Sequence, residues 1–216
     1  VEGFDVEIGK IIASELGIAE SGIEFVESIS KNREDYIVNG TVDVVVATYT
    51  INDKRKEKVA FAGPYYTAGQ DIMVKKDNTT ITGKESLAGK KVCSVTGSTP
   101  ATRVKEQVPT AQLTLFGTYT ECVEAMRNGQ VEATTTDNVI LLGLIDKNPD
   151  EFKLVNKPFS DEPYGIGVKL ADTDFRSFIN DLLEKIYEDG RYKKAYDATL
   201  GKVQPEMPTP PAVNRY

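Results

Sequence analysis

A turn of small polar residues lies between a strand-like run, Val92–Val95, and a predicted helix over residues 101–107. In the turn Thr96-Gly97-Ser98-Thr99-Pro100, Thr99 has the hydroxyl of a helix cap and Pro100 suits the first helical position. The backbone N–H groups of Gly97, Ser98 and Thr99 would then converge on one point, as they do where helix N-termini bind anions. An ordinary helix cap is the alternative that these residues leave open. The chain has neither G-x-x-x-x-G-K-[ST] nor G-x-G-x-x-G, which excludes a Walker loop and a dinucleotide fingerprint.

The residue types that are missing exclude several chemistries. The 216 residues include no histidine, which removes Ser-His-Asp and Cys-His triads, histidine bases and nearly every zinc site. Two cysteines cannot form a four-cysteine metal cage. The net charge of -7, from 26 Lys+Arg against 33 Asp+Glu, argues against a nucleic-acid-binding surface. We therefore expect no metal, no cofactor and no nucleic-acid partner, and a bound anion would need local positive charge.

The composition and the two cysteines bear on the cellular compartment of the protein. With 40% hydrophobic and 27% charged residues, the chain has the composition of a soluble globular protein. No window approaches the roughly 20 apolar residues of a membrane helix, and no charged-then-apolar leader opens the chain. These features indicate a mature, trimmed or cytosolic protein. Cys93 and Cys122 suggest a disulfide in an exported protein but two buried thiols in a cytosolic one, and their spacing leaves both open.

Strand-like and helix-like patterns alternate along the chain, which is typical of α/β layering around a parallel sheet. The expected elements are a helix over 6–16, a strand over 23–28, a helix over 33–38, a strand over 42–48 and a long helical stretch over 174–196 that breaks at Gly190. The run 42–48 is the kind of strand that is buried on both faces. The Pro-rich segment 203–216 predicts an extended surface strap or a disordered tail.

An internal repeat selects two candidate site residues. Residues 23–49 align without a gap over residues 112–138, and both copies read strand, helix, Asn-Gly, Val, acidic residue, strand. Any two βα units look alike to some degree, so chance similarity remains the alternative to two lobes of related topology. Ligands of such sheets bind at the carboxyl ends of the strands. Thr48 and its repeat mate Asp137, both at predicted strand ends, are therefore candidates.

Five motifs in order carry a resemblance to a known family. The stretch 40–66 (GTVDVVVATYTINDKRKEKVAFAGPYY) resembles the extracytoplasmic amino-acid-binding proteins of ABC importers, the polar amino-acid cluster of solute-binding family 3. The other motifs are GFDVEIG, VTGSTPA, TTTDN and EPYGIGVK, and together they cover nearly the whole chain. The segments VCSVTGSTPA and TYTECVEAMRNGQVEATTTD are most similar to glutamate-binding lipoproteins of Gram-positive actinobacteria.

The resemblance implies an α/β, two-lobed, periplasmic-binding-protein-like (type II) fold. Each lobe would be a mostly parallel sheet flanked by helices, with the ligand in the cleft. Lobe I would comprise residues 1–66 and 166–202, lobe II residues 71–160, with hinge crossings near 67–70 and 161–165. Members of the family normally begin with an earlier strand that is central to the first sheet. We expect this strand to be absent here, as in a trimmed, split or rearranged chain, which would leave two strand edges unpaired.

The same resemblance assigns a ligand site, position by position. Thr48 would offer its backbone carbonyl, and Thr50 its hydroxyl, to the α-ammonium group of an amino acid. Asp137 would complete this cation site from lobe II. Arg55 would pair with the α-carboxylate in the bidentate geometry that suits a guanidinium. The amides of residues 97–99 would close over the same carboxylate.

Side-chain specificity depends on Arg33. The segment Ser30-Lys31-Asn32-Arg33 is similar to the Ser-x-Asn-Arg of glutamate/aspartate binders, in which the arginine meets the side-chain carboxylate. A solvated residue in the first helical turn is the usual alternative, but a positive charge there opposes the helix dipole. The expected ligand is therefore an acidic amino acid, glutamate ahead of aspartate. Glutamine or another polar amino acid remains the alternative.

The resemblance also implies a Cys93–Cys122 bridge, an extracytoplasmic lipoprotein or periplasmic protein, an ABC permease as partner and a monomer. An enzyme of the same fold, such as a cyclohexadienyl dehydratase, would need a positioned acid or base. Asp137 is the strong candidate, and it is better used as the ammonium partner, so we expect no catalysis. The effector domain of a LysR-type regulator is a further alternative, although no helix-turn-helix is seen.

Overall fold

The computed structural model describes all 216 residues, which form two compact units. Unit 1 comprises residues 1–28, 32–67 and 163–216, and unit 2 comprises residues 29–31 and 68–162. None of the helices combines the length and the apolar character needed to cross a membrane.

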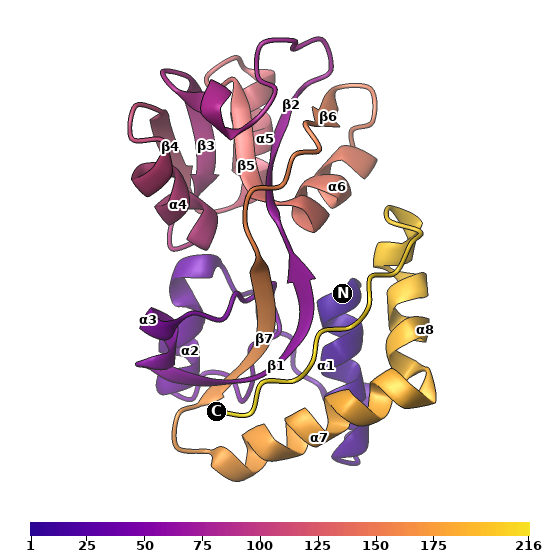
Figure 1. Ribbon diagram of the computed structural model, residues 1–216. Coiled ribbons are helices and arrows are strands. Elements are labelled where there is room, and N and C mark those ends of the chain that lie inside the picture. Colours follow the sequence, from indigo (N-terminus) through magenta and orange to yellow (C-terminus); the bar gives the residue numbers. More distant parts are fainter. The chain divides into compact units, whose positions relative to one another are not determined.

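Unit 2 is built around a five-stranded sheet (Figure 1). Its elements are β2 (Gln70–Lys75), β3 (Lys91–Val95), α4 (Thr99–Gln107), β4 (Gln112–Phe116), α5 (Tyr119–Arg127), β5 (Ala133–Asp137), α6 (Asn138–Asp146) and β6 (Phe152–Leu154). The strand order is β4-β3-β5-β2-β6. Strand β3 is parallel to β4 and β5, whereas β2 is antiparallel to β5 and β6. The α/β fold class is confirmed, but this sheet is mixed and not mostly parallel, because β2 and β6 pair with their neighbours in the antiparallel sense.

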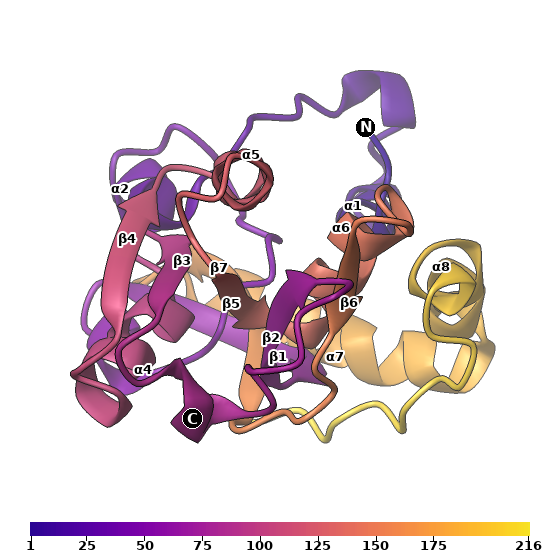
Figure 2. The same cartoon turned by 90° about the horizontal axis from the view of Figure 1, so that it is seen from above.

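The two faces of this sheet carry separate hydrophobic clusters. Side chains alternate along β2, so Met73 packs into one cluster while Ile72 and Val74 pack into the other. Residues of helices α5 and α6 pack into the cluster on the Met73 side of the sheet, and Val108, at the end of α4, packs into the cluster on the opposite side. Figure 2 shows α4 and α5 on opposite faces of the sheet. The sheet is therefore covered on both sides, as an α/β unit requires.

A disulfide joins the middle of the sheet to a covering helix. Cys93 of β3 and Cys122 of α5 are bonded, with their Cα atoms 5.7 Å apart, and no free cysteine remains. Both cysteines are fully buried in the Met73 cluster. The bridge that the family resemblance implied is confirmed.

Unit 1 contains a two-stranded sheet and several helices. Its elements are α1 (Phe4–Glu15), α2 (Arg33–Val38), α3 (Asp53–Lys56), β1 (Val59–Ala68), β7 (Glu162–Lys169), α7 (Thr173–Asp189) and α8 (Arg191–Ala198), together with short 3-10 turns. The expected helices over 6–16, 33–38 and 174–196 are confirmed, and Gly190 ends α7 with a φ of 85°. Phe4 of α1 packs edge-on against Tyr192 of α8, with 5.3 Å between ring centroids. The N-terminal helix is thereby anchored to the C-terminal helices.

Two predicted strands of unit 1 do not form. Residues 23–28 are irregular and pair with no strand, and Phe25 remains 45% exposed. Residues 42–48 contribute one isolated bridge, Val45 to Gly167 of β7, and Val45 is their only buried side chain. A strand requires a continuous ladder with a neighbour, and β-branched composition alone does not supply one. The repeat is consequently complete in its second copy, β4-α5-β5, whereas only the helix of the first copy is regular.

The C-terminal segment is an extended strap. After α8 the chain returns toward β1 (yellow in Figure 1). The Asn214 amide donates to the Gly63 carbonyl at 2.8 Å, and the Tyr216 hydroxyl accepts from the Phe61 amide at 2.9 Å. Arg215 forms ion pairs with Asp181 and Glu184 of α7. Of the two predicted states, extended strap or disordered tail, the strap is confirmed.

The disulfide should contribute strongly to the stability of unit 2. The bridge spans 29 positions of sequence. In the chain-entropy account, closing a loop of this size lowers the entropy of the unfolded chain and stabilises the fold by about 3 kcal/mol. We expect the double variant Cys93→Ala/Cys122→Ala to unfold at a lower urea concentration than the oxidised protein. The oxidised and reduced parent proteins, compared in the same assay, are the control. Equal midpoints for all of these proteins would show that the bridge does not constrain the unfolded chain.

Candidate functional site

In unit 1, the backbone around Thr48 is held by side chains. Thr48 adopts a φ of 43°, which non-glycine residues rarely do. Its amide donates to Asp5 Oδ2 at 2.7 Å, and Tyr65 donates its hydroxyl to Asp5 Oδ1 at 2.6 Å. From the other side, Arg33 Nη1 donates to the carbonyls of Ala47 at 2.9 Å and Thr48 at 3.4 Å. These side-chain hydrogen bonds hold the backbone at Thr48 in the absence of a strand ladder.

Asp5 is a half-buried acidic residue that the sequence analysis did not select. Burial raises the pKa of Asp5 above its ordinary value of 3.8. The hydrogen bonds from Tyr65 and Thr48 and the charge of Arg33 lower this pKa, but by less than burial raises it. Its position in GFDVEIG, one of the motifs that carry the family resemblance, was the available signal.

Both predicted arginines of unit 1 lie over one aromatic ring. The guanidinium carbons of Arg33 and Arg55 are 4.3 and 5.0 Å from the centroid of the Tyr49 ring. Tyr49 is fully buried, and its ring lies so close to the backbone of Gly167 that a Cβ at that position would be 2.8 Å from Tyr49 Cε1. Only glycine allows this approach without displacement of the ring. The ring faces that attract cations are thus fixed in place.

Arg55 also braces the backbone beside it. It lies on the short helix α3, where Asn52 Oδ1 caps its amide at 2.9 Å. Its Nη1 donates to the Thr50 carbonyl at 2.6 Å, and its Nε forms an ion pair with Glu34 Oε1 at 3.3 Å. Thr50 forms a bridge with Tyr164 of β7. The four predicted residues of unit 1, Arg33, Thr48, Thr50 and Arg55, are therefore brought together.

In unit 2, the turn after β3 begins α4 one residue earlier than expected. Ser98, not Thr99, is the N-cap, because Ser98 is still extended while Thr99 is already helical. Ser98 Oγ accepts from the Ala101 amide at 3.1 Å and donates to the Val95 carbonyl at 2.8 Å. The Ser98 amide donates to the same Val95 carbonyl at 3.2 Å, so it belongs to the turn itself. Gly97 takes a φ of 81°, which turns the chain from β3 toward the helix.

Asp137 lies at the same edge of the sheet as this turn. It is the last residue of β5, and β5 is parallel to β3. The carboxyl ends of both strands therefore meet where Asp137 and residues 97–99 follow them, as the sequence analysis expected for a binding edge. Asp137 is 3% exposed. Its repeat mate Thr48 does not end a strand, so the argument from strand ends is confirmed for Asp137 and wrong for Thr48.

Tyr119, the first residue of α5, is a further group at this edge that the sequence analysis missed. Burial raises the pKa of its phenol, the Thr136 hydroxyl lowers it, the Asp137 carboxylate raises it, and the hydroxyls of Ser98 and Ser94 lower it. The repeat contained the signal, because Tyr119 aligns with Ser30 of the Ser-x-Asn-Arg segment.

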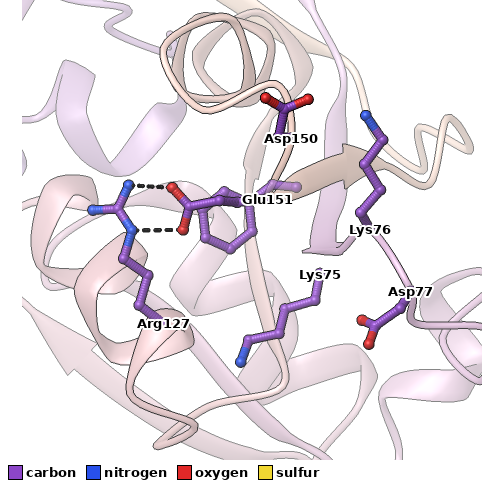
Figure 3. A pocket seen from close by; sticks show the side chains of 7 residues that line it. Lys75, Lys76, Asp77, Arg127, Asp150 and Glu151 are labelled. Carbon is purple, nitrogen blue, oxygen red and sulfur yellow. Dashed lines mark hydrogen bonds and ion pairs between the residues drawn. The ribbon is translucent and has the colours of Figure 1, made fainter.

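A cavity of about 510 Å³ occurs elsewhere in unit 2 (Figure 3). It is lined by Lys75, Lys76, Asp77, Arg127, Asp150, Glu151 and Phe152. Strand β2 begins at Gln70, the register partner of Asp137, and ends at Lys75, the partner of Phe152. The cavity and Asp137 thus lie at opposite ends of β2. Arg127 is engaged by Glu151 through contacts of 2.7 and 2.8 Å, which Figure 3 shows as two dashed lines.

No three histidine, cysteine or acidic side chains are grouped as metal ligands. The polar groups described above can instead form charge-assisted hydrogen bonds: guanidinium groups and a helix N-terminus toward anions, and carbonyls with a carboxylate toward a cation.

The fold is that of the type II periplasmic binding proteins, of the α/β class. Residues 1–202 match the bacterial extracellular solute-binding proteins, family 3, and the chain belongs to this family. The predicted family is therefore confirmed, and membership indicates an extracytoplasmic location.

Two curated relatives and one solved structure illustrate the similarity. An ABC transporter glutamine-binding protein, GlnH of Bacillus subtilis, is 42% identical over 197 residues, covering 91% of this chain and 71% of the relative. A glutamate-binding protein, GluB of Corynebacterium glutamicum, is 41% identical over 212 residues, covering 94% and 72%. The structure of an ancestral arginine-binding protein bound to glutamine is similar with a TM-score of 0.86 and 37% identity, covering 92% of this chain and 88% of that chain.

The Tyr65–Asp5 contact should make stability depend on pH. Tyr65→Phe removes a hydrogen bond that lowers the folded-state pKa of Asp5, so this pKa rises further above its unfolded value. A raised folded-state pKa means that stability is lost as pH rises through it. Relative to the parent protein, the variant should therefore lose about 1–3 kcal/mol more free energy of unfolding at pH 7 than at pH 4.

Tyr192→Phe is the matched control for this comparison, because the Tyr192 hydroxyl donates to the neutral Tyr65 carbonyl. The free energy of unfolding that Tyr192→Phe loses, measured in urea titrations, should be the same at pH 4 and pH 7. If the free energy of unfolding lost by Tyr65→Phe were also the same at both pH values, the Tyr65 hydroxyl would have no influence on the pKa of Asp5.

Proposed function

We propose that this protein binds L-glutamate outside the cytoplasm and delivers it to the permease of an ABC importer. The observation that carries the proposal is the placement of two guanidinium groups, those of Arg33 and Arg55, over the single ring of Tyr49. Both guanidinium carbons are within 5.0 Å of one point, so they can serve two carboxylates of one small molecule. Glutamate carries its two carboxylates three carbons apart.

In the proposed complex each group has one role. Arg55 pairs with the α-carboxylate and Arg33 with the side-chain carboxylate, while the Thr48 carbonyl and the Thr50 hydroxyl receive the α-ammonium group. Unit 2 contributes Asp137 to the ammonium and the turn 97–99 to the α-carboxylate. Charge-assisted hydrogen bonds are the strong kind, and a few of them can account for the roughly 8 kcal/mol of a micromolar complex.

Transport follows from closure about a hinge at the crossings near 67–70 and 161–165. Only a closed form engages both sets of groups, so the ligand shifts the population toward it by its differential affinity. The closed form is the one that the permease would accept. We further propose that the protein is a monomer held at the cell envelope as a lipoprotein or free in a periplasm, and that it has no catalytic activity.

Glutamine is the second candidate, and a specific observation favours it. Arg33 Nη1 already donates to two backbone carbonyls, which is the pattern of an arginine that braces the Thr48 loop. A glutamine-binding relative is 42% identical to this chain. If Arg33 acts only as a brace, the pocket has no second carboxylate partner and an amide side chain suits it better.

A thermal-shift screen of the twenty amino acids tests the proposal directly. A ligand at 100 times its Kd stabilises the folded protein by about 2.7 kcal/mol, which raises the melting temperature measurably. Glutamate should produce the largest shift. A larger shift with glutamine selects the second candidate, and conversion of arogenate or prephenate to the aromatic product would reveal an enzyme instead.

Arg55 should be essential for affinity. Arg55→Ala leaves the ligand's α-carboxylate without its guanidinium partner, which should weaken glutamate binding by about 2–5 kcal/mol. Isothermal calorimetry measures this loss, and Lys54→Ala, an exposed neighbour on the same short helix, is the matched control. A loss below about tenfold would mean that Arg55 does not clamp the carboxylate.

Arg33 should decide between the two candidates. Arg33→Ala removes the proposed partner of the side-chain carboxylate, so the Kd for glutamate should rise far more than the Kd for glutamine. Calorimetry with both ligands on the parent and the variant gives the two ratios. Equal weakening assigns Arg33 to the brace of the Thr48 loop and withdraws the argument for an acidic ligand.

A further inference from the structure

Glu162 is a fully buried carboxylate in unit 2 that the ligand site described above does not use. Three side chains donate to it: the Thr99 hydroxyl to Oε2 at 2.8 Å, the Ser160 hydroxyl to Oε1 at 2.8 Å, and Arg103 Nη1 to Oε1 at 2.5 Å. Thr99 and Arg103 belong to the first two turns of α4. A buried carboxylate is tolerated when it is paired in this way, and removal of a partner is then costly.

Gln70 extends these contacts into a network. Arg103 Nη1 also donates to Gln70 Oε1 at 2.7 Å. Gln70 Nε2 donates to the Pro100 carbonyl at 3.3 Å and to Thr135 Oγ1 at 3.0 Å, and the Gln70 amide donates to Ser160 Oγ at 3.0 Å. The start of α4 is thereby tied to β2 and β5 of the sheet.

The network is adjacent to both ends of residues 68–162, the long segment of unit 2. Gln70 is two residues beyond Ala68, where this segment begins, and Glu162 is its last residue. The start of α4 is therefore bonded to the strands at both crossings. A motion of those strands would carry the start of α4 with it.

The direction of the Thr99 hydrogen bond limits what this residue can offer a ligand. A carboxylate only accepts, and a hydroxyl has one proton. While Thr99 Oγ1 donates to Glu162, the hydroxyl presents only lone pairs to any other group. Lone pairs repel a carboxylate, so this hydroxyl is not a donor to an anionic ligand.

We propose that Glu162 is a positioning residue, which holds the Thr99 hydroxyl and, with Arg103, fixes the start of α4 against the α-carboxylate of the ligand. The proposal rests on the function proposed above. It assigns Thr99 Oγ1 to the support of the site and leaves contact with the ligand carboxylate to the backbone of the turn.

A double-mutant cycle with L-glutamate tests this assignment by calorimetry. Glu162→Gln and Thr99→Val each break the same contact, so each should weaken binding about tenfold, and the double variant should be no weaker than the weaker single variant. Thr99→Ser keeps the hydroxyl and should bind like the parent protein. Losses that multiply in the double variant, or parent-like binding by Glu162→Gln, would overturn the proposal.

A second ligand separates positioning from general damage to the fold. The α-amide of glutamate lacks the negative charge at the α-carboxyl, so its affinity should fall much less than that of glutamate in Glu162→Gln and Thr99→Val. Equal fold-losses for both ligands would show that these variants only loosen the unit. Thr102→Val is the matched control in α4, because the Thr102 hydroxyl donates to the Ser98 carbonyl and not to Glu162.

The outcome distinguishes this proposal from the function on which it rests. If the parent protein binds no amino acid, the proposed function is wrong and the positioning role is withdrawn with it. If the parent binds glutamate while the cycle shows independent losses, the function stands and only the role of Glu162 is wrong.

Discussion

The parallel pairing of β3 with β5 is the constraint on which the rest of unit 2 depends. Parallel strands end at the same edge, so Asp137 at the end of β5 and the turn 97–99 after β3 are brought together by the ladder alone. The disulfide from β3 to α5 fixes the covering helix to the same strand. Tyr119, at the first position of that helix, is placed at this edge as a consequence.

In unit 1, side chains rather than a continuous strand ladder position the candidate site residues. The segment that contains Thr48 and Thr50 has no continuous ladder, and bridges to β7 hold it at Val45 and Thr50 only. Charged side chains supply the remaining order: Asp5 receives the Thr48 amide, and the two guanidinium groups bind the carbonyls of residues 47, 48 and 50. The same arginines therefore organise the backbone and provide positive charge. Ligand selectivity is the property that separates these two roles.

The acidic balance of the chain is compatible with a site for an anion. The net charge of -7 describes the whole surface, whereas a ligand responds to the few charges within reach. Arg33 and Arg55 are 4% and 7% exposed and lie over a buried ring, where the local field is less screened than at the surface.

The sequence by itself determined the family, the α/β class, the helices over 6–16, 33–38 and 174–196, the disulfide once the family was recognised, and Asp137 as a residue at a strand end. These features follow from local patterns or from motifs that stand in order along the chain. Only the tertiary structure decided that residues 23–28 and 42–48 are not strands, that Ser98 rather than Thr99 caps α4, and that Asp5, Tyr119 and Glu162 belong to the polar groups around the candidate site. The physical reason is that strand formation needs a partner ladder, and the direction of a hydroxyl's proton depends on which acceptor folding brings within reach. Both are set by residues far apart in the chain, which no local pattern contains.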